Sequence, residues 1–216
     1  MDRIKKLCSY LSPCESFADI GCDHGYCSEY MLKNGLCEKV TISDVSEKSL
    51  SKAERLLKKY IESGICTAVC CDGLTSIDKN TDLVLIAGIG GEEIVKILKE
   101  SFIPESFVFQ PMHSEADLRK YLLNNDCKLT YDGIFYSGNK YYFVIKGENS
   151  GGEQNYTPAE LAYGRDSLGS PELKSMLKGE IEKAEEYLSR SMSQENRQKL
   201  TDRVIFLRGI LNGEIT

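Results

Sequence analysis

The stretch that decides the fold is Phe17-Ala-Asp-Ile-Gly-Cys-Asp-His-Gly25, a short apolar run that ends in a glycine turn, with a helix-length segment directly after it. This order is typical of the first strand of an open α/β sheet. In such sheets the turn lies at the carboxyl ends of the parallel strands, where a ligand can reach backbone N–H groups and a helix N-terminus. The stretch therefore predicts an α/β fold with a ligand site at this turn.

Similar apolar runs recur along the next 90 residues, and amphipathic segments of helical length separate several of them. The runs are 39–44, 66–71, 82–87 and 106–110, and the helical segments are 46–64, 91–101 and 114–125. Alternating strands and helices predict a mostly parallel sheet that is buried on both faces. Two further extended runs, 128–135 and 140–146, are joined by Tyr-Ser-Gly-Asn and predict an antiparallel hairpin beside the parallel strands.

The pattern changes near residue 150. After a polar break at 148–156, Thr157-Pro158-Ala-Glu160 has the residues of a capping box, and Ser170-Pro171 begins a second helix in the same way. Apolar residues at helical spacing over 173–192 and 200–211 predict an antiparallel helical hairpin whose apolar seam is mostly its own core. We expect two domains, residues 1–150 and residues 151–216.

Charge and hydropathy restrict the partners. The 216 residues include 27 Lys and Arg against 33 Asp and Glu, a net charge of −6 that disfavours indiscriminate binding to polyanions. No apolar run approaches the roughly 20 residues that cross a bilayer, and the opening MDRIKKLCSYL lacks the apolar core of a signal peptide. We therefore expect a cytoplasmic protein without a membrane partner.

Nine cysteines are scattered through the chain. An odd set without a secretion signal argues against a disulfide framework, and the absence of a Cys-x-x-Cys pair argues against structural zinc. We expect no metal, and we interpret most of the thiols as small apolar core residues.

Acidic residues occur at the ends of three successive predicted strands. Asp19 lies in the first, Asp44 ends the second, where a carboxylate can accept both hydrogen bonds of a ribose diol, and Asp72 follows the third, where it could meet an adenine amino group. Each alone could cap a turn. Together they favour a nucleoside ligand that carries little phosphate, because carboxylates repel phosphate. This combination indicates S-adenosylmethionine, whose sulfonium and ammonium groups are cationic.

The fourth strand runs into Ile86-Ala-Gly-Ile-Gly-Gly91. The missing side chains would let a planar substrate approach a methyl donor. The alternative is a tight strand-to-helix turn without a ligand.

Several motifs together resemble the TrmK family, the bacterial tRNA methyltransferases that modify N1 of adenine 22. They are Ala18-Asp-Ile-Gly-Cys-Asp-His-Gly-Tyr26, Cys71-Asp-Gly-Leu74, Ile86-Ala-Gly-Ile-Gly-Gly91, Phe109-Gln-Pro111 and Leu118-Arg-Lys-Tyr-Leu122. The resemblance implies a class I methyltransferase fold, that is, a Rossmann-like, mostly parallel sheet with an antiparallel edge hairpin, plus a C-terminal antiparallel helical hairpin. It also implies S-adenosylmethionine as cofactor and tRNA as substrate.

The candidate site follows from the strand ends and from this resemblance. Asp23 matches the acidic residue proposed to act in catalysis; a carboxylate there could stabilise the charge that alkylation places on adenine or accept a proton from N6, and otherwise it would cap the following helix. We expect cofactor contacts from Asp19, Gly21, Cys22, His24, Gly25, Asp44, Val45, Asp72, Gly73, Ala87, Gly88, Gly90 and Gly91. We expect substrate contacts from Tyr26, Gln110, Pro111 and Arg119, and Tyr26 could equally pack the first helix.

Three departures from the family leave the target nucleotide open. Met112 follows Gln110-Pro111 where the family has asparagine, Cys27-Ser28 stand where a proline is usual, and Phe143 stands where a glutamate is common. Alternatives are therefore a methyltransferase for another RNA or for a small molecule, or an inactive RNA-binding scaffold that retains the cofactor. We expect a monomer, with a homodimer as the alternative.

RNA contact would come from dispersed cations. The candidates are Arg3, Lys5, Lys6, Arg119, Lys120, Arg190, Arg197, Lys199, Arg203 and Arg208. Most of them could instead lie on solvated helix faces.

Overall fold

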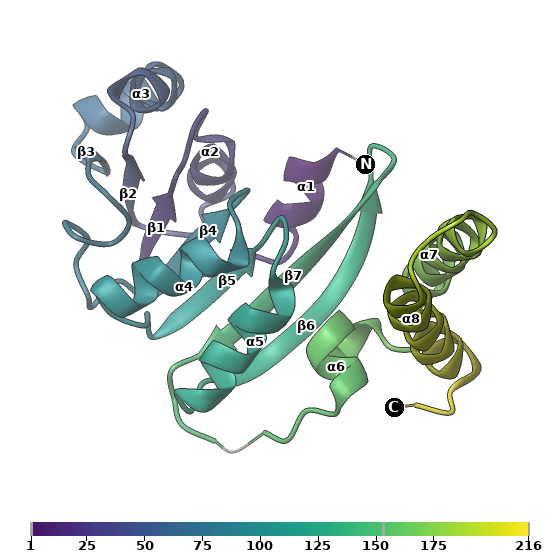
Figure 1. The fold of residues 1–216 in the computed structure, drawn as a ribbon. Coiled ribbons are helices and arrows are strands. Elements are labelled where there is room, and N and C mark those ends of the chain that lie inside the picture. The colour runs from purple at the N-terminus through teal and green to yellow at the C-terminus, as the bar shows by residue number, and fades with distance from the viewer. Residues whose placement is uncertain (1, 153, 216) are drawn as a thin grey trace.

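Within residues 2–152 and 154–215, which this computed structural model describes, a seven-stranded sheet has the order β3-β2-β1-β4-β5-β7-β6 (Figure 1). The strands are β1 (Ser16–Ile20), β2 (Lys39–Asp44), β3 (Cys66–Cys70), β4 (Leu83–Ala87), β5 (Ser106–Gln110), β6 (Lys128–Ser137) and β7 (Lys140–Glu148). Strands β1 to β5 pair in parallel, whereas β7 is antiparallel to both β5 and β6. The predicted parallel sheet with an antiparallel edge hairpin is confirmed.

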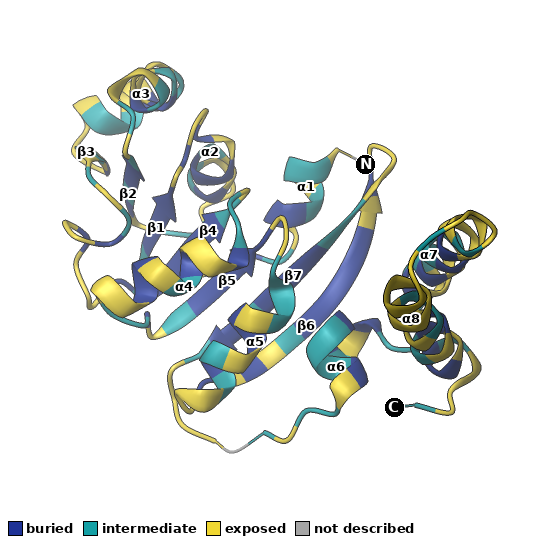
Figure 2. Cartoon of the chain, viewed as in Figure 1, coloured by how far each residue is buried: buried dark blue, intermediate teal, exposed yellow. Residues whose placement is uncertain are grey.

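Helices cover both faces of this sheet, because neighbouring residues of a strand point to opposite sides. In β1, Phe17 packs in the core with α1 (Arg3–Cys8), α2 (Tyr26–Lys33) and α3 (Glu47–Glu62), whereas Ala18 packs with α4 (Gly91–Glu100) and α5 (Glu115–Asn124). The central strands β1, β4 and β5 are mostly dark blue in Figure 2, and the outer helix faces are largely yellow, as expected for a sheet between two helical layers.

One predicted strand is less buried than its sequence suggested. The run at 66–71 was expected to be covered on both faces, but β3 lies at the edge of the sheet, and within it only Cys66 is fully buried. An edge strand has a neighbouring strand on one side alone, so its residues are less covered than those of a central strand, and Thr67 and Cys70 are exposed.

The C-terminal segment forms α6 (Pro158–Tyr163), a short 3-10 helix at Arg165–Ser167, α7 (Pro171–Leu188) and α8 (Gln194–Asn212). The predicted capping box is present: Glu160 N–H donates to the Thr157 hydroxyl, and Thr157 N–H donates to the Glu160 carboxylate. Helices α7 and α8 pack together through an apolar seam, and their facing sides carry the dark blue of buried residues in Figure 2. The seam continues onto Ile134 and Phe143 of the edge hairpin, so this part of the chain packs on the sheet as well as on itself.

Arg119 has a different role from the one its sequence context suggested. Its guanidinium is fully buried and pairs with Asp132 of β6, with Nε 2.8 Å from Oδ2. Nη1 also donates to the backbone carbonyls of Leu161 and Ala162 in α6, and the guanidinium lies over the Phe143 ring. The prediction that Arg119 contacts substrate or RNA is therefore wrong: it joins α5, the edge hairpin and α6.

The cysteines in the described part of the chain are free thiols, and Cys8, Cys22, Cys27, Cys66 and Cys127 are buried. In residues 2–152 and 154–215 no group of three or more His, Cys, Asp or Glu side chains is arranged to hold a metal ion. No helix among the same residues is long and apolar enough to cross a membrane.

Candidate functional site

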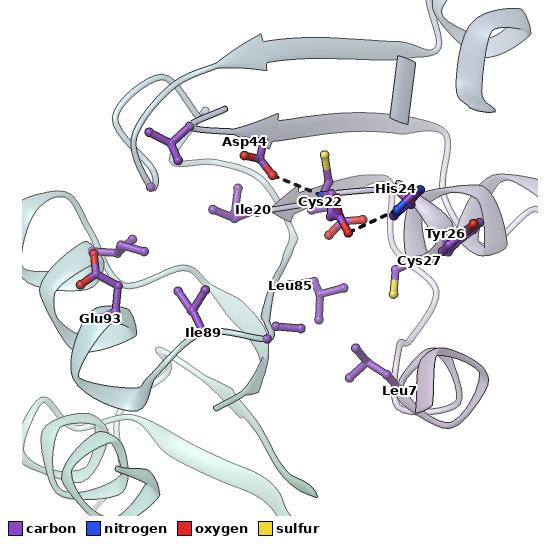
Figure 3. Close-up of a pocket in the computed structure, with 18 of the residues that line it drawn as sticks. Leu7, Ile20, Cys22, His24, Tyr26, Cys27, Asp44, Leu85, Ile89 and Glu93 are labelled. Carbon is purple, nitrogen blue, oxygen red and sulfur yellow. Dashed lines mark hydrogen bonds and ion pairs between the residues drawn. The ribbon is translucent and has the colours of Figure 1, made fainter. Parts of the chain in front are cut away.

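A cavity of about 580 Å³ opens at the carboxyl ends of β1, β2 and β4 (Figure 3). The strand order reverses between β1 and β4, and the crevice at such a reversal is where open α/β sheets bind ligands. The cavity is lined by twelve of the residues predicted from the sequence: Asp19, Gly21, Cys22, Asp23, His24, Tyr26, Asp44, Val45, Asp72, Gly73, Ala87 and Gly88. Its volume lies within the usual range for small-molecule sites, about 300 to 1,000 Å³.

Backbone hydrogen bonds fix the turn that follows β1. Cys22 N–H donates to the Ser43 carbonyl at 3.0 Å, and Asp23 N–H donates to Asp44 Oδ2 at 3.3 Å. Gly21 has φ of 68°, in the left-handed region that favours glycine. Asp44 Oδ1 also accepts from Ser46 N–H at 2.8 Å. Asp44 is thus held at the cavity wall by two backbone N–H groups, and its remaining lone pairs can accept from a ligand.

Asp19 lies beneath the turn and is 5% exposed. Ser28 in α2 donates its hydroxyl to Asp19 Oδ2 at 2.8 Å. Burial outweighs this hydrogen bond and raises the pKa of Asp19 to about 6, and the nearby Asp44 carboxylate acts in the same direction. A cationic ligand in the cavity would favour the ionised form of Asp19.

We predict that Asp19→Asn changes how stability depends on pH. Because burial raises the pKa of the folded state, the stability that Asp19 contributes is fully present below its ordinary pKa of 3.8 and is lost as the pH rises through about 6. Between about pH 4 and pH 7.5, the free energy of unfolding of the asparagine variant should therefore rise relative to wild type by roughly 1 to 3 kcal/mol. Urea unfolding of both proteins at the two pH values measures this difference, and parallel pH profiles would contradict it.

Asp23 does not cap helix α2. The cap of α2 is Gly25, which receives no side-chain hydrogen bond, and Asp23 instead has φ of 44° and an exposed carboxylate. That carboxylate lies 2.7 Å from Lys52 Nζ of α3 and 3.6 Å from His24 Nε2. Asp23 is therefore an accessible carboxylate at the rim, on strained backbone, and such strain is often found at functional sites.

An aromatic pair lies beside Asp23. The rings of His24 and Tyr26 stack with centroids 5.4 Å apart and planes 7° from parallel, and both residues are about half exposed, at 46% and 49%. Figure 3 shows the two rings close together at one end of the cavity. Tyr26 thus packs against His24 rather than into the first helix layer, and the exposed ring faces can stack on a planar base.

The chemistry of the lining fits S-adenosylmethionine. Five carboxylates line the cavity, namely Asp19, Asp23, Asp44, Asp72 and Glu93, which suits a ligand with cationic groups. Apolar side chains of Ile20, Leu85, Ile89 and Ile97 supply a surface for a purine and a thioether chain. Such a mixed lining would disfavour a pyrophosphate dinucleotide.

The sequence did not predict several lining residues. Ile4 and Leu7 come from α1, and Leu7 projects toward the cavity in Figure 3. Arg3, which the sequence offered only as a candidate RNA contact, lies in the same helix and also lines the cavity. Nothing in the local sequence indicated that this helix covers the cavity. Cys27, Cys71 and Glu93 also belong to the lining and lie next to predicted motifs.

Three glycines that were predicted to contact the cofactor lie outside the cavity lining. Close packing against neighbouring segments explains why these positions are glycine. A Cβ on Gly91 would lie 2.3 Å from the Ser114 carbonyl oxygen, and one on Gly90 would lie 2.5 Å from the His113 ring. A Cβ on Gly25 would lie 3.0 Å from Ala53 of α3. For Gly90 and Gly91 this is the tight strand-to-helix turn that the sequence left open as an alternative.

Gln110 and Pro111, predicted as substrate contacts, are buried and do not line the cavity. The Gln110 side chain is occupied internally: Nε2 donates to the Pro111 carbonyl, and Oε1 accepts from Arg3. In this structure they are therefore not substrate contacts.

The predicted RNA-binding cations of the helical hairpin already have partners. Arg190, Lys199, Arg203 and Arg208 form ion pairs with glutamates of α7 or α8, and Arg197 donates to backbone carbonyls at the end of α7. These exposed pairs are weak, so RNA phosphates could compete for the same cations.

Comparison with known proteins identifies a matching family model and several related proteins. The family model described as a methyltransferase domain matches residues 1–145. A Mycoplasma pneumoniae protein provisionally assigned as a tRNA methyltransferase is 28% identical over 68% of this chain and 69% of its own length. The tRNA (adenine(22)-N(1))-methyltransferase of Bacillus subtilis is 26% identical over 75% of this chain and 70% of its own length.

Among solved structures, M. capricolum TrmK in complex with S-adenosylhomocysteine superposes with a TM-score of 0.87 at 21% identity. The match covers 97% of this chain and 96% of that one, so the C-terminal helices are included. The fold predicted from the sequence motifs is confirmed.

Proposed function

This chain belongs to the family of methyltransferase domains, and we propose that it is an S-adenosylmethionine-dependent enzyme that methylates N1 of adenine 22 in tRNA. The Bacillus subtilis relative, which carries this activity in its name, supports the proposal. The observation that carries it is the acidic cavity at the strand reversal, with an exposed aromatic pair beside it. We propose that the enzyme acts in the cytoplasm as a monomer.

In this proposal, three carboxylates of the cavity bind different parts of the methyl donor. Asp44 would accept the hydrogen bonds of the ribose diol, Asp72 would meet the adenine amino group, and Asp19 would favour the cationic end of the donor. Bound there, S-adenosylmethionine supplies an electrophilic methyl group on a sulfonium centre.

The target base must reach this cavity. N1 lies on the Watson–Crick edge of adenine, so the base has to leave its stack before the methyl group can be reached. His24 and Tyr26 offer a stacking surface for the extruded base at the rim, and most of the rate would come from holding N1 in line with the donor. Asp23, next to this surface, would stabilise the positive charge that develops on the purine or accept a proton from N6.

Methyl transfer to defined tRNAs tests the proposal. Unmodified tRNA with adenine at position 22 should accept a labelled methyl group from S-adenosylmethionine, and the same transcript with guanine at that position should not. The modified base should be recovered as 1-methyladenosine after nuclease digestion. Equal labelling of both transcripts would place the target elsewhere in RNA.

The two alternatives predict other results. A small-molecule methyltransferase would label neither transcript but would label a low-molecular-weight extract. An inactive scaffold would bind the donor, measured by calorimetry, without transferring a methyl group to total cellular RNA. Either result would overturn the proposal.

A further inference from the structure

The charges around the cavity are unevenly distributed. Five carboxylates line it, whereas Arg3 is the one Lys or Arg side chain in the lining formed by described residues. The proposed methyl donor carries two cationic groups and one carboxylate. The five acids suit the cations, but they would repel the donor's carboxylate unless a cation lies beside it. The position of Arg3 in an otherwise acidic lining therefore indicates a specific role for this cation.

Arg3 is positioned at the end of β4. A Cβ on Gly88, a lining residue, would lie 3.1 Å from Arg3 Nη2. The guanidinium lies 5.3 Å from the centroid of the Tyr142 ring, which restricts its plane. It thus lies beside the backbone that forms the cavity wall, although residues 9–82 of the chain separate α1 from β4.

Gln110 holds this guanidinium in place. Arg3 Nε donates to Gln110 Oε1 at 3.0 Å, and Arg3 Nη2 donates to the same oxygen. Gln110 is fully buried, and its Nε2 donates to the Pro111 carbonyl at 2.7 Å, so the amide orientation is fixed. No residue in the described part of the chain accepts a hydrogen bond from Arg3 Nη1, which leaves that nitrogen available to an anion.

We propose that Arg3 binds the carboxylate of the methyl donor's amino-acid part and that Gln110 is the positioning residue that orients Arg3. The inference rests on the proposed function and adds a binding residue to it. It accounts for a glutamine that is buried yet bonded to an arginine, and for a cation in an otherwise acidic cavity. It also makes α1 a wall of the donor site, so donor binding should strengthen the attachment of this helix.

A matched pair of donors tests the role of Arg3. S-adenosylmethionine and decarboxylated S-adenosylmethionine differ in the carboxylate alone. By calorimetry, Arg3→Met should weaken the binding of S-adenosylmethionine at least about tenfold, while its affinity for the decarboxylated donor stays within about twofold of wild type. Arg3→Lys should recover part of the loss, because it keeps the charge without the fork of donors.

Lys39→Met is the charge-matched control. Lys39 is exposed at the start of β2, at the opposite end of that strand from the cavity, so its loss should leave both affinities unchanged. Gln110→Leu should weaken binding of the carboxylate-bearing donor and spare the other, because it frees Arg3 without removing its charge.

The outcomes separate this inference from the proposed function. If wild type binds neither donor, the proposed function fails. If Arg3→Met weakens both donors equally, Arg3 only supports α1, and if it weakens neither but raises the KM for tRNA, Arg3 binds an RNA phosphate. Either of these results would overturn the inference while leaving the methyltransferase proposal intact.

Discussion

Replacing Arg119 with methionine should lower the free energy of unfolding by about 3 to 5 kcal/mol. Arg119 and Asp132 are both fully buried and form an ion pair, in which Arg119 Nε donates a bifurcated hydrogen bond to the two Asp132 carboxylate oxygens at 2.9 and 2.8 Å. Methionine fills much of the same volume but leaves the Asp132 carboxylate and two carbonyls of α6 without their donor. Burying an unpaired charge costs far more than an exposed ion pair contributes.

Urea unfolding measures the loss, and a double variant is its control. Arg119→Met combined with Asp132→Leu removes both charges and should recover a large part of the stability, because apolar residues can replace a buried pair at little cost. The α6 carbonyls stay unpaired, so recovery should be incomplete. A loss below about 1 kcal/mol in the single variant would show that water or another group satisfies Asp132.

The Arg119–Asp132 pair also helps to attach the C-terminal helices. Arg119 connects α5 of the methyltransferase part to α6, directly before the α7–α8 hairpin. The hairpin is therefore attached through a buried charged joint as well as through its apolar contact with Ile134 and Phe143. The division of the chain near residue 150 stays a prediction.

Asp23→Asn should lower kcat for tRNA methylation by about 100-fold or more, with donor affinity within about tenfold of wild type. The amide keeps the size of the carboxylate but cannot accept a proton, and it carries no charge to stabilise a cationic purine. Because Asp23 lies at the rim with an exposed side chain, its replacement should leave the fold unchanged. Single-turnover methylation and calorimetry with S-adenosylhomocysteine separate the two effects.

Asp44→Asn is the contrasting variant for this experiment. Asp44 lies on the cavity wall with both oxygens held by backbone N–H groups, so its replacement should chiefly weaken donor binding. Equal kcat in Asp23→Asn and wild type would remove Asp23 from the mechanism. Loss of donor binding in Asp23→Asn, equal to that in Asp44→Asn, would make Asp23 a cofactor residue instead.

Local patterns in the sequence determined the sheet and most of the cavity. The strands at 39–44 and 106–110 have the predicted bounds. Runs of five or six residues that are rich in β-branched or aromatic side chains and lie between turn residues are too short for most helices and are typical of buried strands. Parallel strands place their carboxyl ends at one edge, so Asp19, Asp44 and Asp72 line one cavity, as predicted. These inferences needed only the order of residues along the chain.

The tertiary structure alone decided the roles of Arg3, Gln110 and Arg119. Arg3 and Gln110 are 107 positions apart, and Arg119 meets both Asp132 and the carbonyls of α6. Whether a charged side chain lies in solvent, in a cavity or in a buried pair depends on which distant segments pack around it, because its free energy is set by local dielectric and by partners. Hydrophobic periodicity predicts which face of a helix or strand is buried, but it does not predict which distant segment packs against a charged side chain.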